Sequence, residues 1–523
     1  MQRVVSAEEI RWCDDTTINT YGVPGLLLME NAGRGVAEVV KQEFSLLANK
    51  HILVVCGKGN NGGDGFVAAR LLSNSGARIG VLMMVVPSEL EGDVKTNFNI
   101  LRKFVEKSSG QITIHRFSKQ IFAELSPSDI ILDAMFGTGF TGPLGKPYIE
   151  VIEWMNRQRA KVVAIDIPSG VNGTTGVVDN IAVRAKITVT FGCLKTGLLC
   201  NQGRRSVGSV KVIDIGIPRL VSEDKRLQTS LVELSDVRRV LPKRAMNVHK
   251  YDVGKVFVLA GSQELTGAAA MCCTATLRAG AGAVVLGTPE PVYPILARKL
   301  TEVMVFSFPA TRDGTLSLAA LEGICEKLSW ADVLVVGPGL SQNPETQQLI
   351  IKILLEHRGK ALIDADGLNA IAAHGISVLR SSRAQFILTP HVGEFSRLTG
   401  IASNEVEQSR IESTRNLAKK INTTVVLKGV PTVTASNDGA VVLNSTGNPG
   451  MATAGTGDVL SGIIAGLWAQ GMSDTEAAWT GVYLHGLSGD IAVKKIGEQS
   501  LMANDVIEYL PAALQSTEAG AAA

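Results

Sequence analysis

Short runs of apolar, often β-branched residues alternate with longer stretches of helical periodicity along most of the chain. In the first half the strand-like runs cover residues 51–56, 79–86, 130–134, 161–165 and 187–191. In the second half they cover residues 255–259, 283–286, 333–336, 361–363, 386–388 and 424–427. This rhythm predicts an α/β fold with a parallel sheet in each half. Most runs end in Gly, Asp, Ser or Pro, so we expect ligands at the carboxyl edge of each sheet.

The pattern is interrupted at residues 217–229, which are polar and lack strong periodicity, before a helical opening at 232–241. A chain of 523 residues also exceeds the size at which a single hydrophobic core keeps growing. We therefore predict one domain over residues 1–222 and a second over residues 228–515. We expect residues 516–523 to form a disordered tail, because STEAGAAA offers almost nothing to bury.

Composition and charge narrow the class of protein. Hydrophobic residues make up 45% and charged residues 19% of the chain, which is ordinary for a folded protein. The net charge is only +2 and the basic residues are scattered, which argues against a nucleic-acid partner. The apolar runs are far shorter than a membrane span, and the amino terminus lacks the apolar core of a signal peptide. We expect a cytoplasmic homo-oligomer that binds small molecules and neither nucleic acid nor membrane.

A glycine-rich loop, GKGNNGGDG at residues 57–65, follows the first of these strands and opens a helix. It matches the dinucleotide-binding pattern G-x-G-x-x-G, but such a turn is also a common tight corner. Asp64 would lie where the helix amino terminus receives a pyrophosphate, and its carboxylate would repel that group. The loop therefore argues against an NAD-dependent dehydrogenase module unless a cation offsets the charge.

Two later strand ends supply further oxygen atoms for the same edge of the sheet. They are Asp133 in LDAMFGTGF, and Asp166 and Ser169 in AIDIPSG. A carboxylate held in a cleft can move a proton to or from a substrate. The alternative is that these side chains only cap the turns that follow them.

A second glycine-rich segment, NPGMATAGTGD at residues 448–458, leads into an apolar helix in the second half. Gly455, Thr456 and Gly457 can turn successive backbone N–H groups toward an anion at the start of that helix. Asp458 would then lie beside a bound phosphate and could take a proton from an attacking hydroxyl. We interpret His485, in VYLHG on an apolar helix, as a core residue.

The first-half loops GNNGGDG, DAMFGTG and DIPSG resemble those of the NAD(P)H-hydrate epimerase family, over about Leu26 to Gly216. The resemblance implies a Rossmann-like three-layer sandwich with Asp166 as the catalytic acid or base. It also implies a potassium ion held by Asn61, Asp133 and Ser169. The residues implied to contact the hydrated cofactor are Asn60, Asn61, Gly62, Gly63, Asp64, Gly137, Thr138, Gly139, Phe140, Thr141, Gly142, Pro143 and Asp166.

The second half resembles the ribokinase-like superfamily, and more narrowly the ADP-dependent NAD(P)H-hydrate dehydratase family, over about Val232 to Leu514. The motifs that carry this resemblance are HKYDVGKVFVLAGS, VVGPGL, IDADGLNA, LTPHVGE, LKGVPT and GNPGMATAGTGDVLSG. It implies ADP with magnesium, which Glu394 would help to order through water, and Asp458 as the catalytic residue. The residues implied to contact the hydrated cofactor are Ala269, Gly339, His391 and Asp458. Those implied to contact the nucleotide are Lys428, Gly429, Val430, Pro431, Thr432, Gly455, Thr456 and Gly457.

Together the two resemblances predict a bifunctional enzyme. One half would interconvert the R and S forms of hydrated NADH or NADPH, and the other would dehydrate the S form while consuming ADP. VPT and the serine of GLSQ depart from the glycine-richer versions in the family, which leaves the choice between ADP and ATP open. The alternative is a ribokinase-like small-molecule kinase preceded by a Rossmann-like regulatory or interaction domain.

Overall fold

The computed structural model describes residues 1–108, 110–244 and 246–518. Contacts divide the chain into two compact units, one spanning Arg3–Leu227 and the other combining residues 1–2 with the chain from Gln228 onward. The division falls inside the polar stretch at 217–229. The sequence had placed Met1 in the first domain, but its amino group lies 2.5 Å from the Asp236 carboxylate in the second unit.

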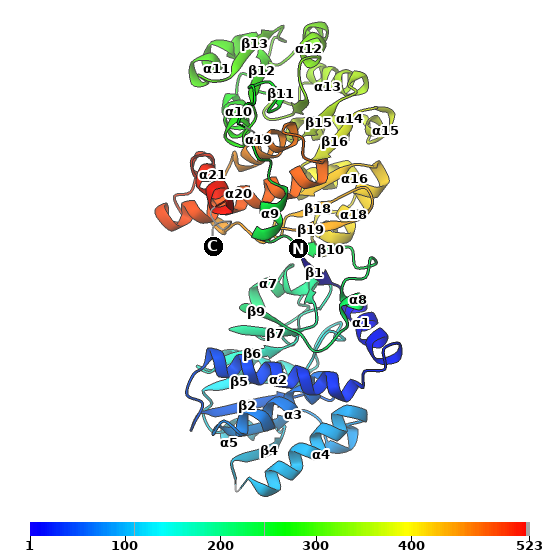
Figure 1. The fold of residues 1–523 in the computed structure, drawn as a ribbon, viewed down its shortest axis with the longest axis vertical. Coiled ribbons are helices and arrows are strands. Elements are labelled where there is room, and N and C mark those ends of the chain that lie inside the picture. Colours follow the sequence, from blue (N-terminus) through cyan, green and yellow to red (C-terminus); the bar gives the residue numbers. More distant parts are fainter. Residues whose placement is uncertain (109, 245, 519–523) are drawn as a thin grey trace. The chain divides into compact units, whose positions relative to one another are not determined.

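The first unit is built on a sheet with the strand order β4-β3-β2-β5-β6-β7-β9, in which every neighbouring pair is parallel (Figure 1). Its strands are β2 (His51–Cys56), β3 (Arg78–Met83), β4 (Ile112–Arg116), β5 (Ile130–Ala134), β6 (Lys161–Ile165), β7 (Ile187–Phe191) and β9 (Ser209–Ile213). A separate parallel pair joins β1 (Gln2–Val5) to β8 (Leu194–Lys195).

Helices cover both faces of this sheet, each over its own apolar core. The first core contains side chains of α2 (Gly25–Glu43), α3 (Asn60–Ser73) and α4 (Gly92–Lys107). The second core contains side chains of α5 (Ile121–Glu124) and α6 (Lys146–Arg157). The remaining helices are α1 (Ala7–Asn19), α7 (Gly203–Ser206) and α8 (Arg219–Ser222). The predicted three-layer α/β sandwich is confirmed.

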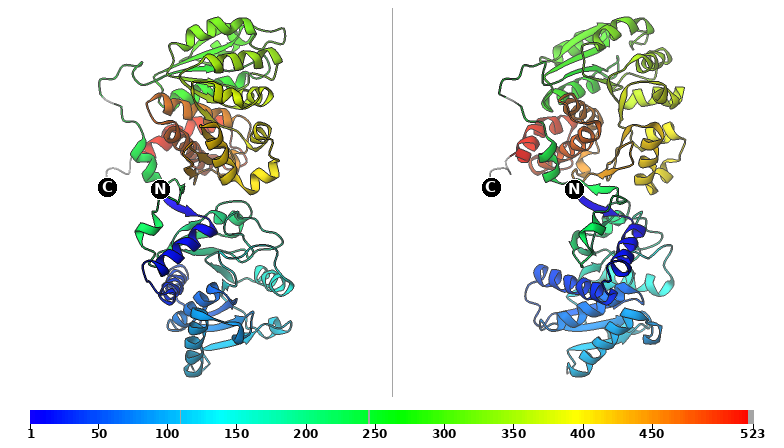
Figure 2. Two further views of the ribbon diagram at one scale, coloured as in Figure 1. Left: turned by 90° about the vertical axis from the view of Figure 1, so that its right-hand side faces the viewer. Right: turned by 45° about the vertical axis from the view of Figure 1, so that its right-hand side comes forward.

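The sheet of the second unit runs β13-β12-β11-β14-β15-β16-β17-β18-β19-β10. Figure 2 shows the ribbon of the chain from two further sides. Only β18 runs antiparallel to its neighbours among the described strands. The strands are β10 (Thr229–Leu231), β11 (Lys255–Leu259), β12 (Ala283–Pro289), β13 (Met304–Phe308), β14 (Val333–Val336), β15 (Lys360–Ile363), β16 (Gln385–Leu388), β17 (Thr424–Leu427), β18 (Val433–Ala435) and β19 (Val441–Leu443).

A large apolar core on this sheet is formed with α10 (Thr266–Arg278), α19 (Thr456–Ala469), α20 (Asp474–Ile496) and α21 (Ala503–Glu518). The other helices are α9 (Leu234–Val240), α11 (Tyr293–Lys299), α12 (Leu321–Leu328), α13 (Pro344–Glu356), α14 (Ala365–His374), α15 (Ser377–Ser381), α16 (Val392–Thr399), α17 (Ser403–Gln408) and α18 (Arg410–Ile421). This arrangement confirms the predicted second α/β domain.

Helix α21 corrects the predicted start of the carboxyl-terminal tail. Residues 516–518 belong to this helix rather than to a disordered segment. Thr517 is buried, and the Arg238 guanidinium donates hydrogen bonds to the carbonyl oxygens of Ser516 and Thr517, which terminate the helix favourably. The rest of the predicted tail, residues 519–523, lies outside the described residues.

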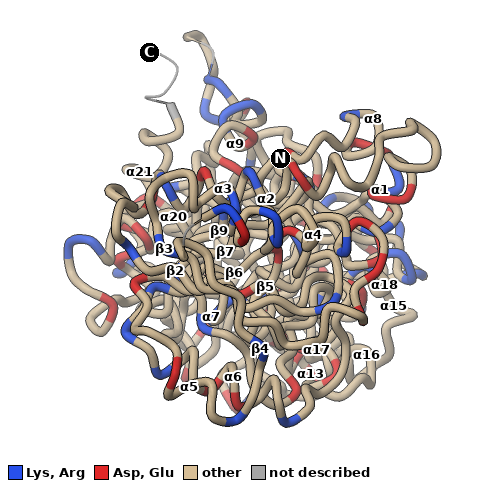
Figure 3. The backbone as a smooth tube through the Cα atoms, turned by 90° about the horizontal axis from the view of Figure 1, so that it is seen from below, with Lys and Arg blue, Asp and Glu red and all other residues tan. Residues whose placement is uncertain are grey.

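Charged residues of both signs are interspersed along the backbone (Figure 3). None of the helices within the described ranges combines the length and the apolar character needed to cross a membrane.

Candidate active sites

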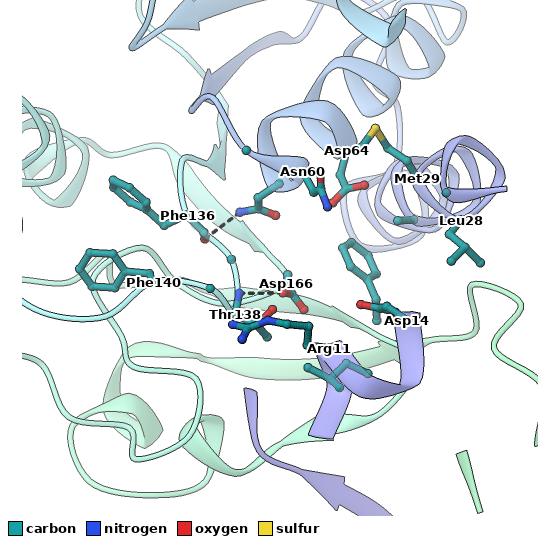
Figure 4. Close-up of a pocket in the computed structure, with 18 of the residues that line it drawn as sticks. Arg11, Asp14, Leu28, Met29, Asn60, Asp64, Phe136, Thr138, Phe140 and Asp166 are labelled. Atoms are coloured by element: carbon teal, nitrogen blue, oxygen red, sulfur yellow. Dashed lines mark hydrogen bonds between the residues drawn. The ribbon is translucent and has the colours of Figure 1, made fainter. Parts of the chain in front are cut away.

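The first unit contains a cavity of about 610 Å³ at the carboxyl edge of its sheet. Its walls come from α1, α2 and the start of α3, from the loops after β5 and β6, and from β8 (Figure 4). Among the predicted site residues, those that line the cavity are Asn60, Asn61, Asp64, Gly137, Thr138, Gly139, Phe140, Thr141 and Asp166. Gly62, Gly63, Gly142 and Pro143 are not part of its wall.

The glycine loop after β2 brings the start of α3 against the loop after β5. A Cβ atom on Gly57 would lie 2.1 Å from the Met135 carbonyl oxygen, so only glycine allows this approach. Asp64 is buried in the first turn of α3, and burial together with the nearby Asp166 charge holds its pKa well above the usual range. A raised pKa favours the neutral form of Asp64, which weakens the sequence argument that a pyrophosphate would meet a repelling carboxylate here.

The three predicted cation ligands are Asn61, which lines the cavity, and Asp133 and Ser169, which do not; hydrogen bonds to Phe136 connect Asn61 to Ser169. The Asp133 carboxylate accepts hydrogen bonds from the Ser169 amide at 2.7 Å and the Ser169 hydroxyl at 2.6 Å. The Phe136 amide donates to the Ser169 hydroxyl, and the Asn61 side-chain amide donates to the Phe136 carbonyl oxygen at 2.8 Å. The Asn61 carbonyl oxygen Oδ1 is buried with no partner among the described residues. Burial raises the pKa of Asp133 to about 6.

Asp166 follows β6 with a left-handed backbone, at φ = 63°. Its Oδ2 accepts from the Thr138 amide at 3.3 Å and its Oδ1 accepts from the Thr190 hydroxyl at 3.1 Å. The Lys195 ammonium lies 2.8 Å from Oδ1 and is almost fully buried. A non-glycine residue in this conformation costs free energy that the surrounding structure must offset, a pattern that is common at active sites. The contacts of Asp166 exceed those of a simple turn cap.

The sequence argument missed Lys195, Arg11 and Asp14, all of which line the cavity. Lys195 comes from β8 and also donates to the Phe191 carbonyl oxygen at 2.7 Å. A lysine in GCLKTG after a buried strand carries no local signal of function. Its role becomes visible only when the fold places it against Asp166.

In the second unit, α19 begins at Thr456 after Gly455, and no side chain among the described residues caps it. The first backbone N–H groups of this helix have no intrahelical acceptor, which makes its amino terminus suitable for an anion. The Thr456 side chain turns back to the carbonyl oxygens of Met451 and Thr453, and His485 Nε2 lies 2.9 Å from the Thr456 carbonyl oxygen. His485 therefore supports the glycine-rich loop rather than packing as an ordinary core residue.

Lys428, at the end of β17, connects this helix to the neighbouring strand ends. Its Nζ lies 2.7 Å from Asp364 Oδ1 and 3.9 Å from Glu394 Oε2. The second oxygen of Asp364 accepts a hydrogen bond from the Ser461 hydroxyl on α19 at 2.7 Å. A Cβ atom on Gly457 would lie 3.4 Å from Lys428 Nζ, so the lysine reaches the glycine-rich loop. The structure thus places Lys428 close to both Gly457 and Glu394.

Asp458 lies in the first turn of α19 in a strongly acidic setting. Burial raises its pKa to about 7, and the Asp364 charge adds to this effect while Lys428 opposes it. Asp364 itself was overlooked in the sequence motif IDADGLNA, because a buried Asp before a helix has the same local pattern as a capping residue.

The buried Arg410 supports the loop after β17, whose residues the sequence predicts to contact the nucleotide. The guanidinium donates to the carbonyl oxygens of Leu427 at 3.3 Å and Lys428 at 3.0 Å. The Thr432 hydroxyl donates to the Gly429 carbonyl oxygen, and the Val430 side chain is exposed. Pro431, which completes the predicted segment, follows a cis peptide bond.

His391 caps α16, because its Nδ1 accepts from the amides of Gly393 at 3.0 Å and Glu394 at 3.3 Å. Burial and the nearby Lys428 charge lower its pKa. The contacts of Nδ1 match the alternative in which the backbone satisfies His391, and the other ring nitrogen, Nε2, lies 3.3 Å from Glu394 Oε1. Gly339 packs against Leu265, whereas Ala269 is fully buried in α10. Their predicted contacts with a ligand stay predictions.

Comparison with known proteins matches each half of the chain to a family model. A family model described as NAD(P)H-hydrate dehydratase matches residues 256–512, and one described as YjeF-related protein N-terminus matches residues 25–197. An ADP/ATP-dependent NAD(P)H-hydrate dehydratase from Bacillus subtilis, co-crystallised with ATP and Mg²⁺, is 31% identical, with a TM-score of 0.48. It covers 55% of this chain and 98% of its own.

Two curated relatives are each named bifunctional NAD(P)H-hydrate repair enzyme. The one from Moorella thermoacetica is 41% identical over 517 residues, which cover 98% of this chain and 97% of the relative. The one from Escherichia coli is 32% identical over 506 residues, which cover 96% and 92%. Since these alignments span both units from end to end, the chain belongs to the family of bifunctional NAD(P)H-hydrate repair enzymes.

Proposed function

We propose that this chain restores hydrated NADH and NADPH with two active sites. The first unit interconverts the R and S forms of the hydrated cofactor. The second unit dehydrates the S form while ADP is converted to AMP and phosphate. The observation that carries the proposal is the Asp458 carboxylate beside the uncapped amino terminus of α19, since it pairs a base with an anion site.

In the first unit, the reacting carbon bears a hydroxyl group and adjoins the ring nitrogen. Loss of that hydroxyl and return of water on the other face require a group that donates and accepts a proton. Asp166 is suited to this task because it lines the cavity and is fixed by Thr138, Thr190 and Lys195. The aromatic side chains of Phe136 and Phe140, with ring centroids 4.9 Å apart, lie in the same wall.

In the second unit, Asp458 takes the proton of the substrate hydroxyl as that oxygen attacks the terminal phosphorus of the nucleotide. The N–H groups at Gly455, Thr456 and Gly457 stabilise the charge on the transferred phosphoryl group. Phosphate is a better leaving group than hydroxide, and it departs with the electrons of the C–O bond. Loss of a proton from the adjacent ring carbon then forms the double bond that restores the dihydronicotinamide ring. Lys428 supplies positive charge next to this loop, within 2.7 Å of Asp364.

The residues behind the first cavity fit a potassium ion. The Asn61 carbonyl oxygen is buried without a partner, and the buried Asp133 carboxylate needs positive charge nearby. Carbonyl, carboxylate and hydroxyl oxygens are the ligands of hard cations. Asn61, Asp133 and Ser169 would hold the ion, which would supply a positive charge at the rear of the site.

The second site fits magnesium bound with the nucleotide. Carboxylates outnumber cations among the described residues here, because the charges of Asp364, Glu394 and Asp458 all act on Lys428. Magnesium usually keeps several waters and binds through one or two carboxylates together with phosphates. Glu394 would help to hold it, and the ion would offset charge on the phosphates.

The proposal is tested with the purified chain and a mixture of both epimers of hydrated NADH, followed by chiral chromatography. We expect both epimers to disappear with ADP and magnesium, and the two epimers to equilibrate faster than they do spontaneously when no nucleotide is present. A phosphorylated product that accumulates without restoring NADH would instead support the small-molecule kinase. The comparison of ADP with ATP in the same assay fixes the nucleotide. The cytoplasmic location and the homo-oligomeric state stay predictions from the sequence.

A further inference from the structure

Helix α1 contributes one row of side chains to the cavity of the first unit. Ile10, Asp14 and Ile18 are spaced four residues apart, so they share one face of the helix, and all three line the cavity. Ser6 and Glu9 form a capping box that fixes the start of this helix. An aspartate between two isoleucines on a cavity face is not a solvated surface charge, and none of the roles described above uses it.

The Asp14 carboxyl group lacks a partner in this position. Its Oδ1 is buried and accepts no hydrogen bond from any described residue. A buried carboxylate oxygen without a donor is costly, so hydrogen bonding within the fold does not account for Asp14 at this position. The residue lines the cavity, where its carboxyl group can meet a bound substrate.

The reaction proposed for this unit needs proton transfer on both faces of the substrate ring. On one face the C–O bond breaks, the hydroxyl takes one proton and leaves as water, and the ring-nitrogen lone pair forms a C=N bond. On the other face a water oxygen attacks the same carbon, the C=N electrons return to nitrogen, and that water gives up one proton. One water leaves and one enters, so no oxidant or reductant is needed. A single fixed carboxylate reaches only one of the two faces.

We propose that Asp14 is a second catalytic residue of the epimerase site, which serves one face of the substrate ring while Asp166 serves the other. This inference rests on the proposed epimerase activity. Figure 4 shows Asp14 and Asp166 reaching the cavity from different elements, α1 and the end of β6, with Asp64 higher in the view. In each direction of the reaction one carboxyl donates a proton and the other accepts one, and the roles exchange when the direction reverses.

Asp64 is the nearest competitor for this role, but its environment favours one protonation state. Burial and the charges of Asp166 and Asp14 raise the pKa of Asp64 well above the usual range, which favours its protonated form. Burial raises the pKa of Asp14 only to about 6, because the Lys195 ammonium opposes the effect of burial and of Asp166. Asp14 can therefore exchange a proton near neutral pH, as efficient acid–base catalysis requires.

The pH dependence of Asp14 reflects groups on several elements. Cys13 and Asp15 interact with it from α1 itself, and Asp64 interacts from α3. Asp166 after β6, Cys193 before β8 and Lys195 in β8 interact with it from the sheet side.

The experiment compares full-length Asp14→Asn with Asp15→Asn, which changes the adjacent, exposed residue of the same helix. The conversion of the pure R epimer to the S epimer is followed without nucleotide, over a pH range on both sides of 6, and the spontaneous rate is subtracted. We expect Asp14→Asn to slow the conversion by about 100-fold or more and to remove the inflection near pH 6. Asp15→Asn should match the wild type, and Asp14→Glu should retain an inflection.

Dehydration of the pure S epimer with ADP checks that the chain is folded, and Asp14→Asn should leave it unchanged. The inference is overturned if Asp14→Asn converts the epimers at close to the wild-type rate. It is also overturned if the rate falls but the pH profile keeps its shape, because Asp14 would then only position other groups. A wild-type enzyme that does not accelerate the conversion would instead reject the proposed epimerase activity, and this inference with it.

Discussion

Replacing Asp458 with asparagine should make the protein more stable at high pH while abolishing dehydration. The folded-state pKa of Asp458 is about 7, against an ordinary value of 3.8. The folded protein therefore retains a proton that the unfolded chain releases between about pH 4 and 7, and stability falls as the pH rises through this range. Above pH 7 the folded protein bears the full free-energy cost of ionising the buried Asp458 side chain. Asparagine never ionises, so the variant does not bear this cost.

The magnitude follows from the size of that pKa difference. Each tenfold change in proton affinity corresponds to about 1.4 kcal/mol, so the pKa difference limits the gain in unfolding free energy to about 4 kcal/mol. Solvent screening reduces this value, because Asp458 is only partly buried. The variant loses the favourable contact of a carboxylate with a helix amino terminus, about 0.3–1 kcal/mol. This loss is smaller than the gain from removing the buried charge. A net stabilisation of about 1–3 kcal/mol should remain.

The assay is thermal unfolding of wild type and Asp458→Asn without nucleotide or magnesium, at a pH near 4 and at one well above 7. The two proteins should differ little at low pH, and the variant should melt several degrees higher at high pH. Restoration of NADH should fall by about 100-fold or more in the variant. In the wild type it should rise as the pH increases through about 7, because the base must be ionised. A variant that is no more stable at high pH, or that still restores NADH, would refute this reasoning.

Three further substitutions test other parts of the two sites. Asp166→Asn should stop epimer exchange and leave dehydration of the S epimer intact, as measured by chiral chromatography; continued exchange would reject its catalytic role. Lys195→Met should also stop exchange and lower the free energy of unfolding by about 3–5 kcal/mol, because it leaves the Asp166 charge buried and unpaired. The control Lys211→Met, at an exposed lysine, should neither stop exchange nor lower stability by this amount. Gly337→Ala should abolish dehydration and lower the melting temperature, since its Cβ would lie 1.7 Å from the Asp364 carbonyl oxygen at a φ of 130°; normal stability would contradict the packing described.

The central strands of both sheets could be predicted from the sequence, but the edge strands could not. Runs such as 130–134 and 333–336 are buried on both faces, so every residue in them is apolar or nearly so. The edge strands β4, β9 and β13 are partly exposed and contain polar residues, as in ITIHR and SVKVI, so no continuous apolar run marks them.

A similar distinction applies to the residues of the candidate sites. Some are marked by their neighbours in the sequence, and others only by partners far away in the chain. Asp458 follows a glycine-rich turn and Asp166 follows a buried strand directly before IPSG, so both are marked by a few adjacent residues. Lys195, Asp14 and Asp364 gain their roles from partners that lie far away in the chain: Asp14 is 152 residues from Asp166, and Lys428 is 64 residues from Asp364. Nothing in their local sequence distinguishes them from a core lysine or a capping aspartate.

The most direct test of two independent active sites in one chain is complementation between two full-length variants, each of which has one inactive site. A mixture of R and S hydrated NADH with ADP and magnesium is supplied to Asp166→Asn, to Asp458→Asn, and to both variants together, and each epimer is quantified after subtraction of spontaneous exchange. We predict that Asp166→Asn consumes only the S epimer, that Asp458→Asn restores no NADH, and that the mixture consumes both epimers. Consumption of both epimers by Asp166→Asn alone, or failure of the mixture to consume the R epimer, would contradict the account.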